Sequence, residues 1–207
     1  MKKGLFISFE GGDGTGKSTQ VRLLANRLVD QGCLVRTTRE PGGTDVSEKI
    51  RDVLKFSSID SITELLLMFA ARREHYVKTI RPLIDQGYIV ICDRFYDSSL
   101  VYQGVLKNIP VDQIMQLKNM TLGNFEPDFT IILDIPSNVA KERILHRQLC
   151  LDNYDNMSGN EYDLIREGFK RLTEIFPFRC KLINALGDEK RVFARVYKAI
   201  DKFLSLI

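Results

Sequence analysis

The segment 11–18 carries residues whose types and spacing suit the binding of a polyphosphate. Its sequence, GGDGTGKS, fits the P-loop pattern G-x-x-x-x-G-K-[ST]. Glycines let backbone N–H groups converge on phosphate oxygens, and a following helix N-terminus favours negative charge there. Lys17 would reach the β- and γ-phosphates, and the Ser18 hydroxyl would ligate Mg²⁺. We therefore expect a nucleoside triphosphate site made by Gly11, Gly12, Asp13, Gly14, Thr15, Gly16, Lys17, Ser18 and Thr19.

The elements around this loop match the demands of the pattern. Residues 5–9 form an apolar run that predicts a buried strand, and residues 18–28 predict a helix with one apolar stripe. The alternative is a glycine turn that merely joins a strand to a helix. The strand, the spacing, the lysine and the serine together favour the phosphate site.

Two further charged clusters follow predicted strands directly. Arg39 and Glu40 follow residues 32–38, and Asp93 and Arg94 follow residues 88–92. Ligands bind beyond the carboxyl ends of parallel strands, so we expect these clusters to share one edge with the P-loop. Asp93 has the place of a Walker-B acid that holds Mg²⁺, although an acid at a strand end can also cap a turn. Arg94 suits a phosphate, and a surface salt bridge to Asp97 is the alternative.

The arginines indicate which P-loop class this is. No N-K-x-D guanine signature occurs, which disfavours a GTPase switch. Phosphoryl transfer to a second nucleotide needs many guanidinium groups around the transferred group. Arg143 and Arg147 are spaced i, i+4 and precede a polar stretch from 149 to 160, so residues 143–160 could form a lid that carries an arginine over the donor phosphates. A solvated basic helix face is the alternative.

The whole pattern predicts one α/β domain over residues 1–207. Further strands are expected at 129–133 and 180–184, and further helices at 44–54 and 62–85, so that strands and helices alternate around a parallel sheet. The net charge of +3 is too mild for a nucleic-acid binder, and no apolar run approaches the ~20 residues of a membrane span. The short start before the first strand leaves no room for a signal peptide, and the four cysteines form no C-x-x-C pair. We expect a cytoplasmic protein with free thiols and neither a membrane nor a nucleic acid as partner.

Five blocks of sequence carry a family resemblance. They are FEGGDGTGKSTQ at 9–20, TREPGGT at 38–44, FAAR at 69–72, DRF with SS and YQG within 93–104, and PDF to Asp134 at 127–134. In this order they resemble thymidylate kinases over residues 5 to about 175. The resemblance implies a P-loop kinase fold with a five-stranded parallel sheet flanked by helices on both faces. It also implies Mg²⁺-dependent phosphorylation of dTMP by ATP in dTTP biosynthesis, and a homodimer.

The resemblance also implies roles for single residues. Arg72 would hydrogen-bond the thymine ring, and Tyr102 would crowd the 2′ position of the sugar. Arg51 and Arg94 would hold the acceptor phosphate, and Asp13 would lie by the 3′-hydroxyl and a metal-bound water. The implied catalytic set is Lys17, Arg94, Asp13, Arg143 and Arg147. The implied dTMP site is Asp13, Glu40, Pro41, Arg51, Phe69, Arg72, Arg94, Ser98, Ser99, Tyr102 and Gln103, with Ser18 and Asp93 for the metal.

Three positions depart from the family pattern. The aromatic that stacks on thymine lies four residues before the base-binding arginine, where this chain has Met68, so Phe69 is the candidate here. Some members carry an arginine where this chain has Gly14, and members with glycine draw it from the lid. The lid often continues as Asp-Arg-aromatic-acid, whereas this chain reads DNYD at 152–155. His75 is expected to be a helix-surface or packing residue, and His146 a surface residue.

Two other functions remain open from the residues. A kinase for another nucleoside monophosphate would share the P-loop and the arginines. A nucleotide-dependent switch or binding module would bind ATP without dTMP-dependent ADP release. Lys17, Ser18, Asp93 and Arg94 are all present, which disfavours a module that has lost catalysis.

Overall fold

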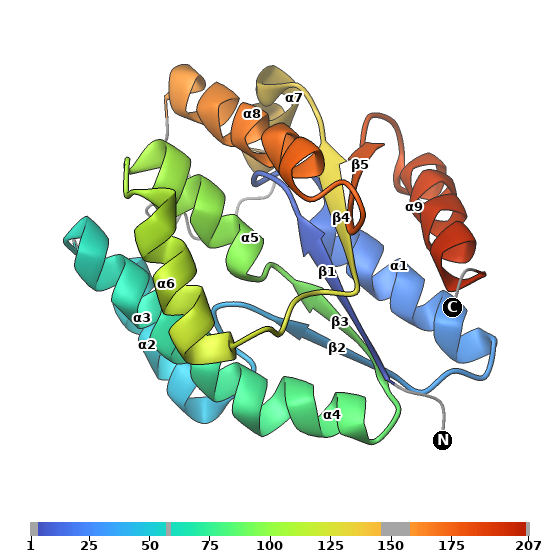
Figure 1. Ribbon diagram of the computed structural model, residues 1–207. Helices are drawn as coiled ribbons and strands as arrows, with labels where there is room; N and C mark the ends of the chain where they lie inside the picture. Colours follow the sequence, from blue (N-terminus) through green and yellow to red (C-terminus); the bar gives the residue numbers. More distant parts are fainter. Residues whose placement is uncertain (1–3, 57–58, 146–157, 206–207) are drawn as a thin grey trace.

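Five parallel strands form the centre of the molecule, in the order β2-β3-β1-β4-β5 (Figure 1). The computed structural model describes residues 4–56, 59–145 and 158–205. The predicted five-stranded parallel α/β fold is confirmed. The strands are β1 (Leu5–Glu10), β2 (Val35–Arg39), β3 (Ile89–Asp93), β4 (Phe129–Asp134) and β5 (Cys180–Asn184).

Helices cover both faces of this sheet, as predicted (Figure 1). One face is covered by α1 (Lys17–Asp30) and α9 (Glu189–Leu204). The other is covered by α3 (Ser61–His75), α5 (Tyr96–Ser99), the π-helical segment η2 (Leu100–Leu106), α6 (Val111–Leu122) and α8 (Gly159–Ile175). The remaining helices are α2 (Asp45–Phe56), the π-helical segment η1 (Tyr76–Ile80), α4 (Arg81–Asp85) and α7 (Ser137–Leu145).

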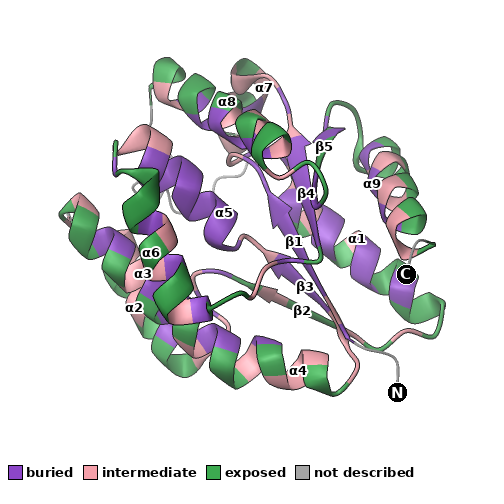
Figure 2. Cartoon of the chain, in the orientation of Figure 1, coloured by how far each residue is buried: buried purple, intermediate pink, exposed green. Residues whose placement is uncertain are grey.

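Alternation along the central strands produces two separate cores. On β1, Phe6 belongs to the core under α3 and α8, whereas Ile7 and Phe9 belong to the core under α1 and α9. All three side chains are fully buried, because the strand has a helical layer on each side (Figure 2). A strand enclosed in this way holds the loop that follows it in a fixed place.

The strand register brings the predicted polar clusters to one edge. Phe9 pairs with Asp93, and Arg39 pairs with the same Asp93. The ends of β1, β2 and β3 are therefore level, and the loops that follow them leave the sheet side by side. This confirms the prediction that the P-loop and the two charged clusters share an edge.

Two predicted elements differ from the observed ones. The strand predicted at 32–38 is observed at Val35–Arg39, because Gly32 and Cys33 donate backbone hydrogen bonds to Val29 and Leu28 and so end α1. The helix predicted over 62–85 is observed as α3, η1 and α4 in succession, so the helical path is continuous but widens at 76–80.

The sequence predicts a polar stretch without helical pattern from 149 to 160, but helix α8 already begins within it. Helix α8 begins at Gly159, and Ser158 caps it: the Ser158 hydroxyl accepts from the Glu161 amide while the Glu161 carboxylate accepts from the Ser158 amide. This capping box, S-x-x-E, was present in the sequence as a helix-start signal. The rest of the predicted lid between 146 and 157 lies outside the described residues.

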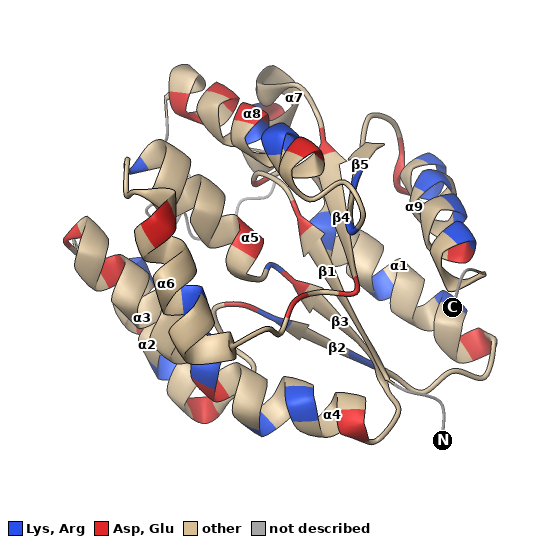
Figure 3. Ribbon diagram, in the orientation of Figure 1, with Lys and Arg blue, Asp and Glu red and all other residues tan. Residues whose placement is uncertain are grey.

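The charged residues are mixed over the surface helices, as in an ordinary globular domain. Both signs of charge are spread over the helices, and Lys and Arg gather on α9 (Figure 3). Among the described helices, none has the length and apolar content to cross a membrane. Cys33, Cys92 and Cys180 are free thiols.

Candidate active site

The P-loop joins β1 to α1, and the side chain of its lysine turns back to contact the backbone of the loop. The Lys17 ammonium donates to the carbonyl oxygens of Gly11 (2.9 Å) and Gly12 (2.8 Å), and the Thr15 hydroxyl donates to the Gly12 carbonyl (2.8 Å). Helix α1 begins at Lys17, with no side chain capping its N-terminus and no acidic residue in its first turn. This end of the helix therefore keeps its positive dipole for an anion.

Burial and a neighbouring cation make Lys17 easier to deprotonate than an ordinary lysine. The side chain is 7% exposed. Burial, followed by repulsion from Arg94, lowers the pKa of Lys17 from 10.5 to about 8, against the attraction of Asp13 and Asp93. An incoming phosphate would reverse this effect because it supplies negative charge.

Ser18 and Asp93 bring two oxygen groups together at the mouth of the loop. Ser18 lies at the start of α1, and Asp93 is the last residue of β3. The Ser18 hydroxyl donates to Asp93 Oδ2 at a distance of 2.6 Å. A hydroxyl and a carboxylate are the oxygen donors that Mg²⁺ prefers. Among the described residues, no three His, Cys, Asp or Glu side chains gather into a site of their own.

Arg94 is held by four contacts, two to the P-loop, one to α5 and one to η2. Its Nη2 donates to Asp13 Oδ1 (2.6 Å) and to the Tyr102 hydroxyl (3.1 Å), and its Nη1 donates to the Gly11 carbonyl and the Ser98 hydroxyl, both at 3.1 Å. Its backbone has a φ of 72°, which aims the side chain back across the loop. Burial raises the pKa of Asp13, but Arg94 and then Lys17 outweigh it and lower the value to about 2.

The alternative contact of Arg94, a salt bridge to Asp97, is not formed. Asp97 instead pairs with Arg179, with an Nη1–Oδ2 distance of 2.7 Å and an Nη2–Oδ1 distance of 2.8 Å. Asp97 is fully buried. The Arg94 guanidinium instead lies against the P-loop, through Gly11 and Asp13.

Glu10 holds Phe95 and Ser98, two residues next to Arg94, and had no role in the sequence-based prediction. It ends β1, is fully buried, and accepts hydrogen bonds from the Phe95 amide (2.7 Å) and the Ser98 hydroxyl (2.6 Å). Burial, with the charge of Asp97 adding to it, raises the pKa of Glu10 to about 8. An acid that ends an apolar strand directly before a P-loop was the available signal.

A cavity of ≈ 250 Å³ lies over this edge of the sheet. On the P-loop side it is lined by Asp13, Gly14, Gly16, Lys17, Ser18, Asp93 and Arg94. Its lining also includes Glu40, Pro41, Arg51, Ser98, Tyr102 and Gln103, all six of them predicted for the acceptor. The structure thus brings the predicted donor and acceptor residues to one cavity.

Three predicted acceptor residues lie behind the wall of the cavity. Phe69 is 1% exposed and belongs to the core, whereas Met68 lines the cavity. Arg72 is 1% exposed and Ser99 is fully buried, and the Arg72 guanidinium donates to Glu40 (2.6 Å), Ser99 (3.1 Å) and the Phe95 carbonyl (3.3 Å). Among the predicted donor residues, Gly11, Gly12, Thr15 and Thr19 form the loop and the first turn of α1 without lining the cavity.

The two arginines predicted for the lid have different outcomes. Arg143 lies on α7 and donates to the carbonyl oxygens of Gly14 (3.4 Å), Ala185 (3.3 Å) and Gly187 (3.2 Å), so it contacts the P-loop without lining the cavity. Arg147 lies outside the described residues.

Five further residues line the cavity and stand outside the predicted set of site residues. They are Arg39, Leu54, Lys55, Glu64 and the already discussed Met68. Helical spacing was the signal for four of them. Leu54 and Lys55 follow Arg51 by three and four residues on α2, and Glu64 and Met68 are i, i+4 on α3.

His75 is a packing residue, one of the two predicted outcomes, and it also makes polar contacts that were not predicted. It is fully buried, and its ring nitrogens contact Glu40 Oε1 (3.1 Å) and Thr38 Oγ1 (2.7 Å). The two partners precede it by 35 and 37 residues, so no local pattern could reveal them. His146 lies outside the described residues.

Comparisons with known proteins agree with this geometry. A family model described as thymidylate kinase matches residues 9–196. A thymidylate kinase of Symbiobacterium thermophilum is 42% identical over 203 residues, covering 97% of this chain and 94% of that protein. One of Shouchella clausii is 38% identical over 208 residues, covering 99% and 98%.

A solved structure is also similar along almost the whole chain. The crystal structure of thymidylate kinase from Ehrlichia chaffeensis matches with a TM-score of 0.78 and 37% identity, covering 96% of this chain and 98% of that one. The family model, the relatives and the P-loop kinase fold lead to the same conclusion. This chain belongs to the thymidylate kinase family.

Proposed function

We propose that this chain transfers the γ-phosphoryl group of ATP to dTMP, giving ADP and dTDP for dTTP biosynthesis. One observation carries the proposal: a single cavity is lined by Lys17 and Ser18 of the P-loop, by Arg94, which is bonded to the same loop, and by Arg51 of α2. Two phosphorylated ligands can meet in such a cavity. The relatives' name, thymidylate kinase, supports dTMP as the acceptor.

The chemistry needs positioning and charge neutralisation more than acids or bases. An oxygen of the acceptor phosphate forms the new bond to the γ-phosphorus, and the bond from that phosphorus to the β–γ bridging oxygen breaks. Lys17 exchanges its Gly11 and Gly12 carbonyl partners for oxygens of the β- and γ-phosphates. Arg94 spreads positive charge over the transferred group, and the Asp13 carboxylate keeps its fork in place.

We propose that Ser18 and Asp93 hold Mg²⁺ together with the substrate. The fit rests on the 2.6 Å contact between their side chains, which places two hard oxygen donors at one point beside the P-loop. Bound Mg²⁺ supplies positive charge to the β- and γ-phosphates. Its remaining ligands would be phosphate oxygens and water, as is usual for this ion.

We propose that the acceptor nucleoside occupies the side of the cavity lined by Tyr102 and Met68. The Tyr102 hydroxyl contacts Arg94 and Asp13, and the role proposed for its ring is to crowd the 2′ position of the sugar. Arg72 is held behind the cavity wall by Glu40, Ser99 and the Phe95 carbonyl, so its guanidinium, which moves as one plane, must shift to contact the base. We also propose that a basic residue of the 143–160 segment closes on ATP, with Arg143 as the described candidate.

A coupled assay of ADP formation tests the proposed function. The purified chain is given ATP and Mg²⁺ with dTMP, dUMP, dCMP or dGMP, and kcat/KM is compared among the four acceptors. We expect dTMP to be the best acceptor. If dTMP is no better than the others, the chain is a kinase for another monophosphate; ATP binding without dTMP-dependent ADP release indicates a binding module.

The Lys17→Ala variant is the control for this assay. It removes the ammonium that meets the β- and γ-phosphates, and we expect it to lower kcat by a factor on the order of 10³. Contaminating kinases would be insensitive to this change, so residual dTMP-dependent activity at the wild-type level would show that the signal comes from elsewhere.

We propose a cytoplasmic homodimer. The free thiols of Cys33, Cys92 and Cys180 support a reducing compartment. On α3, Leu65 and Phe69 belong to the chain's own core, but Ile62 and Leu66 are 45% and 49% exposed and are available to a second copy. Light scattering after size exclusion tests the dimer, and Leu66→Glu should shift the mass toward that of one chain.

A further inference from the structure

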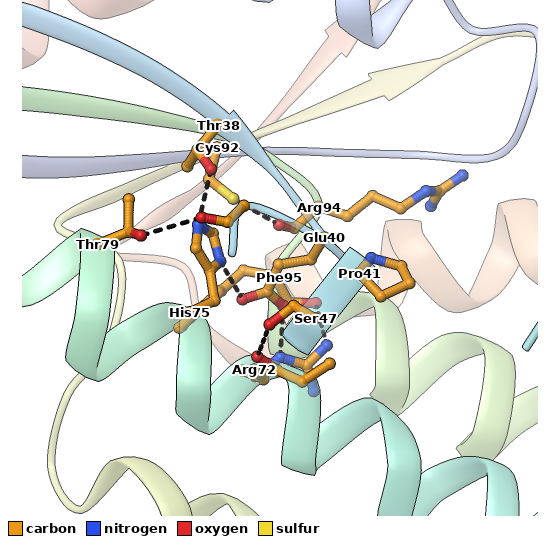
Figure 4. A network of polar contacts seen from close by, with 12 residues as sticks. Thr38, Glu40, Pro41, Ser47, Arg72, His75, Thr79, Cys92, Arg94 and Phe95 are labelled. Atoms are coloured by element: carbon orange, nitrogen blue, oxygen red, sulfur yellow. Dashed lines mark hydrogen bonds and ion pairs between the residues drawn. The ribbon is translucent and has the colours of Figure 1, made fainter. Parts of the chain in front are cut away.

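The loop that lines the acceptor side of the cavity is attached to α3 through a buried histidine. Residues 40–43 follow β2 directly and lead through Thr44 into α2, and Glu40 and Pro41 line the cavity. Figure 4 shows the His75 ring between Thr38 and Glu40, with Arg72 approaching the same glutamate from α3. Glu40 is 3% exposed, and His75 is fully buried.

The hydrogen bonds around Glu40 divide its two oxygens between two donors. His75 Nδ1 is 3.1 Å from Oε1, and Arg72 Nε is 2.6 Å from Oε2. A carboxylate only accepts, so Nδ1 carries the proton that it donates to Glu40. The other ring nitrogen, Nε2, lies 2.7 Å from the Thr38 hydroxyl, which can donate or accept. His75 therefore connects the last turn of α3 to both the strand end and the loop.

Close packing between Gly43 and the His75 ring holds the other end of the loop. A Cβ on Gly43 would lie 2.5 Å from Cδ2 and Nε2 of His75, so the glycine is packed against the ring. The Thr79 hydroxyl donates to the Gly43 carbonyl at 3.0 Å. Both ends of the loop, Glu40 and Gly43, are thus fixed by α3 and η1.

The middle of the same loop is bonded to Arg51 of α2, a candidate for binding the acceptor phosphate. The Pro41 carbonyl accepts from Arg51 Nη1 at 2.9 Å, and Arg51 lines the cavity. A shift of the loop would move this carbonyl and the guanidinium bonded to it. On the donor side, the side chains of Lys17 and Ser18 contact Gly11, Gly12 and Asp93, none of which belongs to this loop. The loop reaches that side through a backbone bond at its first residue, from the Glu40 amide to the Asp93 carbonyl, which does not involve His75.

We infer that His75 is a positioning residue for the acceptor: by donating to Glu40 it fixes the 40–43 loop, and with it Pro41 and Arg51, for binding of the monophosphate. The inference rests on the proposed function, since it assigns this side of the cavity to dTMP. It predicts that changes at His75 raise KM for dTMP while KM for ATP stays near the wild-type value.

The test compares two variants that each keep one half of the histidine. His75→Asn places an amide nitrogen near the position of Nδ1 and keeps a donor for Glu40. His75→Gln places its amide near the position of Nε2 and keeps only a partner for Thr38. We expect His75→Gln to raise KM for dTMP roughly tenfold, because a buried carboxylate oxygen loses its donor. His75→Asn should stay within about threefold of wild type.

Both KM values and the melting temperature are measured for each variant. KM does not depend on the fraction of chains that is folded, so partial unfolding lowers kcat without imitating the expected result. Equal KM values for dTMP in the two variants, or an equal rise in KM for ATP, would contradict the inference. Thr38→Val is the matched control: it removes only the contact at Nε2 and should leave KM for dTMP within about threefold.

Failure of the proposed function gives a different result. In that case wild-type protein itself shows no dTMP-dependent ADP formation. An active wild type with unchanged KM for dTMP in His75→Gln would leave the proposed function intact and overturn the role of His75.

Discussion

Gly14 of the P-loop lies against the backbone of Ala140 in α7: a Cβ on Gly14 would be 2.4 Å from the Ala140 carbonyl oxygen. One helical turn later, Arg143 Nη1 is 3.4 Å from the Gly14 carbonyl. The helix that leads into the predicted lid therefore packs directly on the loop. This contact leaves no room for a P-loop arginine at position 14, and it brings a basic residue of α7 to the same point.

Substitution of this glycine tests the contact. Gly14→Ala adds a methyl group to a backbone with a φ of +78° and forces α7 away from the loop. Left-handed backbone alone costs about 1–2 kcal/mol for a non-glycine residue, or roughly 2–8 °C in Tm for a chain of this size. The clash adds to this cost, and we expect KM for ATP to rise as well.

Gly32→Ala is the matched control for Gly14→Ala. Gly32 has a φ of +81°, and a Cβ there meets nothing within 4 Å. This variant should show only the cost of the backbone conformation, with KM for ATP unchanged. Equal losses of Tm in the two variants would mean that α7 does not press on the loop.

The lowered pKa of Lys17 predicts how activity depends on pH. Burial and repulsion from Arg94 lower it to about 8 in the free protein, and the protonated form is the one that meets the triphosphate. Since kcat/KM for ATP reports the free enzyme, it should be flat below about pH 7 and fall as pH rises above 8, approaching about tenfold per unit.

Glu10 is the second group with a pKa of about 8 near this loop, so it needs its own control. Glu10→Gln removes that titration and keeps one acceptor for the Phe95 amide or the Ser98 hydroxyl. The fall in kcat/KM for ATP should persist in this variant. Its disappearance would assign the pH dependence to Glu10.

The sequence predicted the donor side of the cavity because its signals are local. Lys17 and Ser18 belong to one contiguous motif, and Asp93 and Arg94 follow a buried strand immediately. Parallel pairing then places them together without further information, since the register sets Phe9 level with Asp93.

The acceptor side was less predictable because it depends on the rotation of α3. Leu65, Phe69 and Arg72 form one stripe, which faces the core, and Glu64 and Met68 form the adjacent one, which faces the cavity. Phe69 and Met68 are neighbours in sequence, so a rotation of α3 about its axis by one residue exchanges which of them faces the cavity. The amphipathic pattern of α3 is too weak to predict that rotation. The contacts of His75 could not be predicted either, because they join residues more than thirty positions apart.

The contact between Ser18 and Asp93 predicts the response to metal. Asp93→Asn replaces one oxygen ligand by an amide group and removes its charge. We expect the Mg²⁺ concentration for half-maximal velocity to rise by roughly ten- to a hundredfold, with ATP held saturating. Asp30→Asn is the control, since Asp30 is exposed at the far end of α1 and should leave the Mg²⁺ titration unchanged. An unchanged titration in Asp93→Asn would exclude Asp93 from the metal site.

The buried pair of Asp97 and Arg179 predicts the largest loss of stability. Asp97 is fully buried and makes two contacts with the guanidinium, at 2.7 and 2.8 Å. Asp97→Ala removes the buried carboxylate that makes both short contacts and leaves only Glu126, whose Oε2 lies 3.5 Å from Arg179 Nε, so we expect a loss of about 3–5 kcal/mol in the free energy of unfolding.

Denaturant melts of three variants measure this loss. Asp85→Ala is the control, because the Arg81–Asp85 pair is exposed, with side chains 58% and 57% accessible, and should change stability by less than about 1 kcal/mol. The double variant Asp97→Leu, Arg179→Met removes both charges and should recover much of the stability lost in Asp97→Ala. No recovery in the double variant would mean that Asp97 stabilises the fold through the backbone of α5 and not through Arg179.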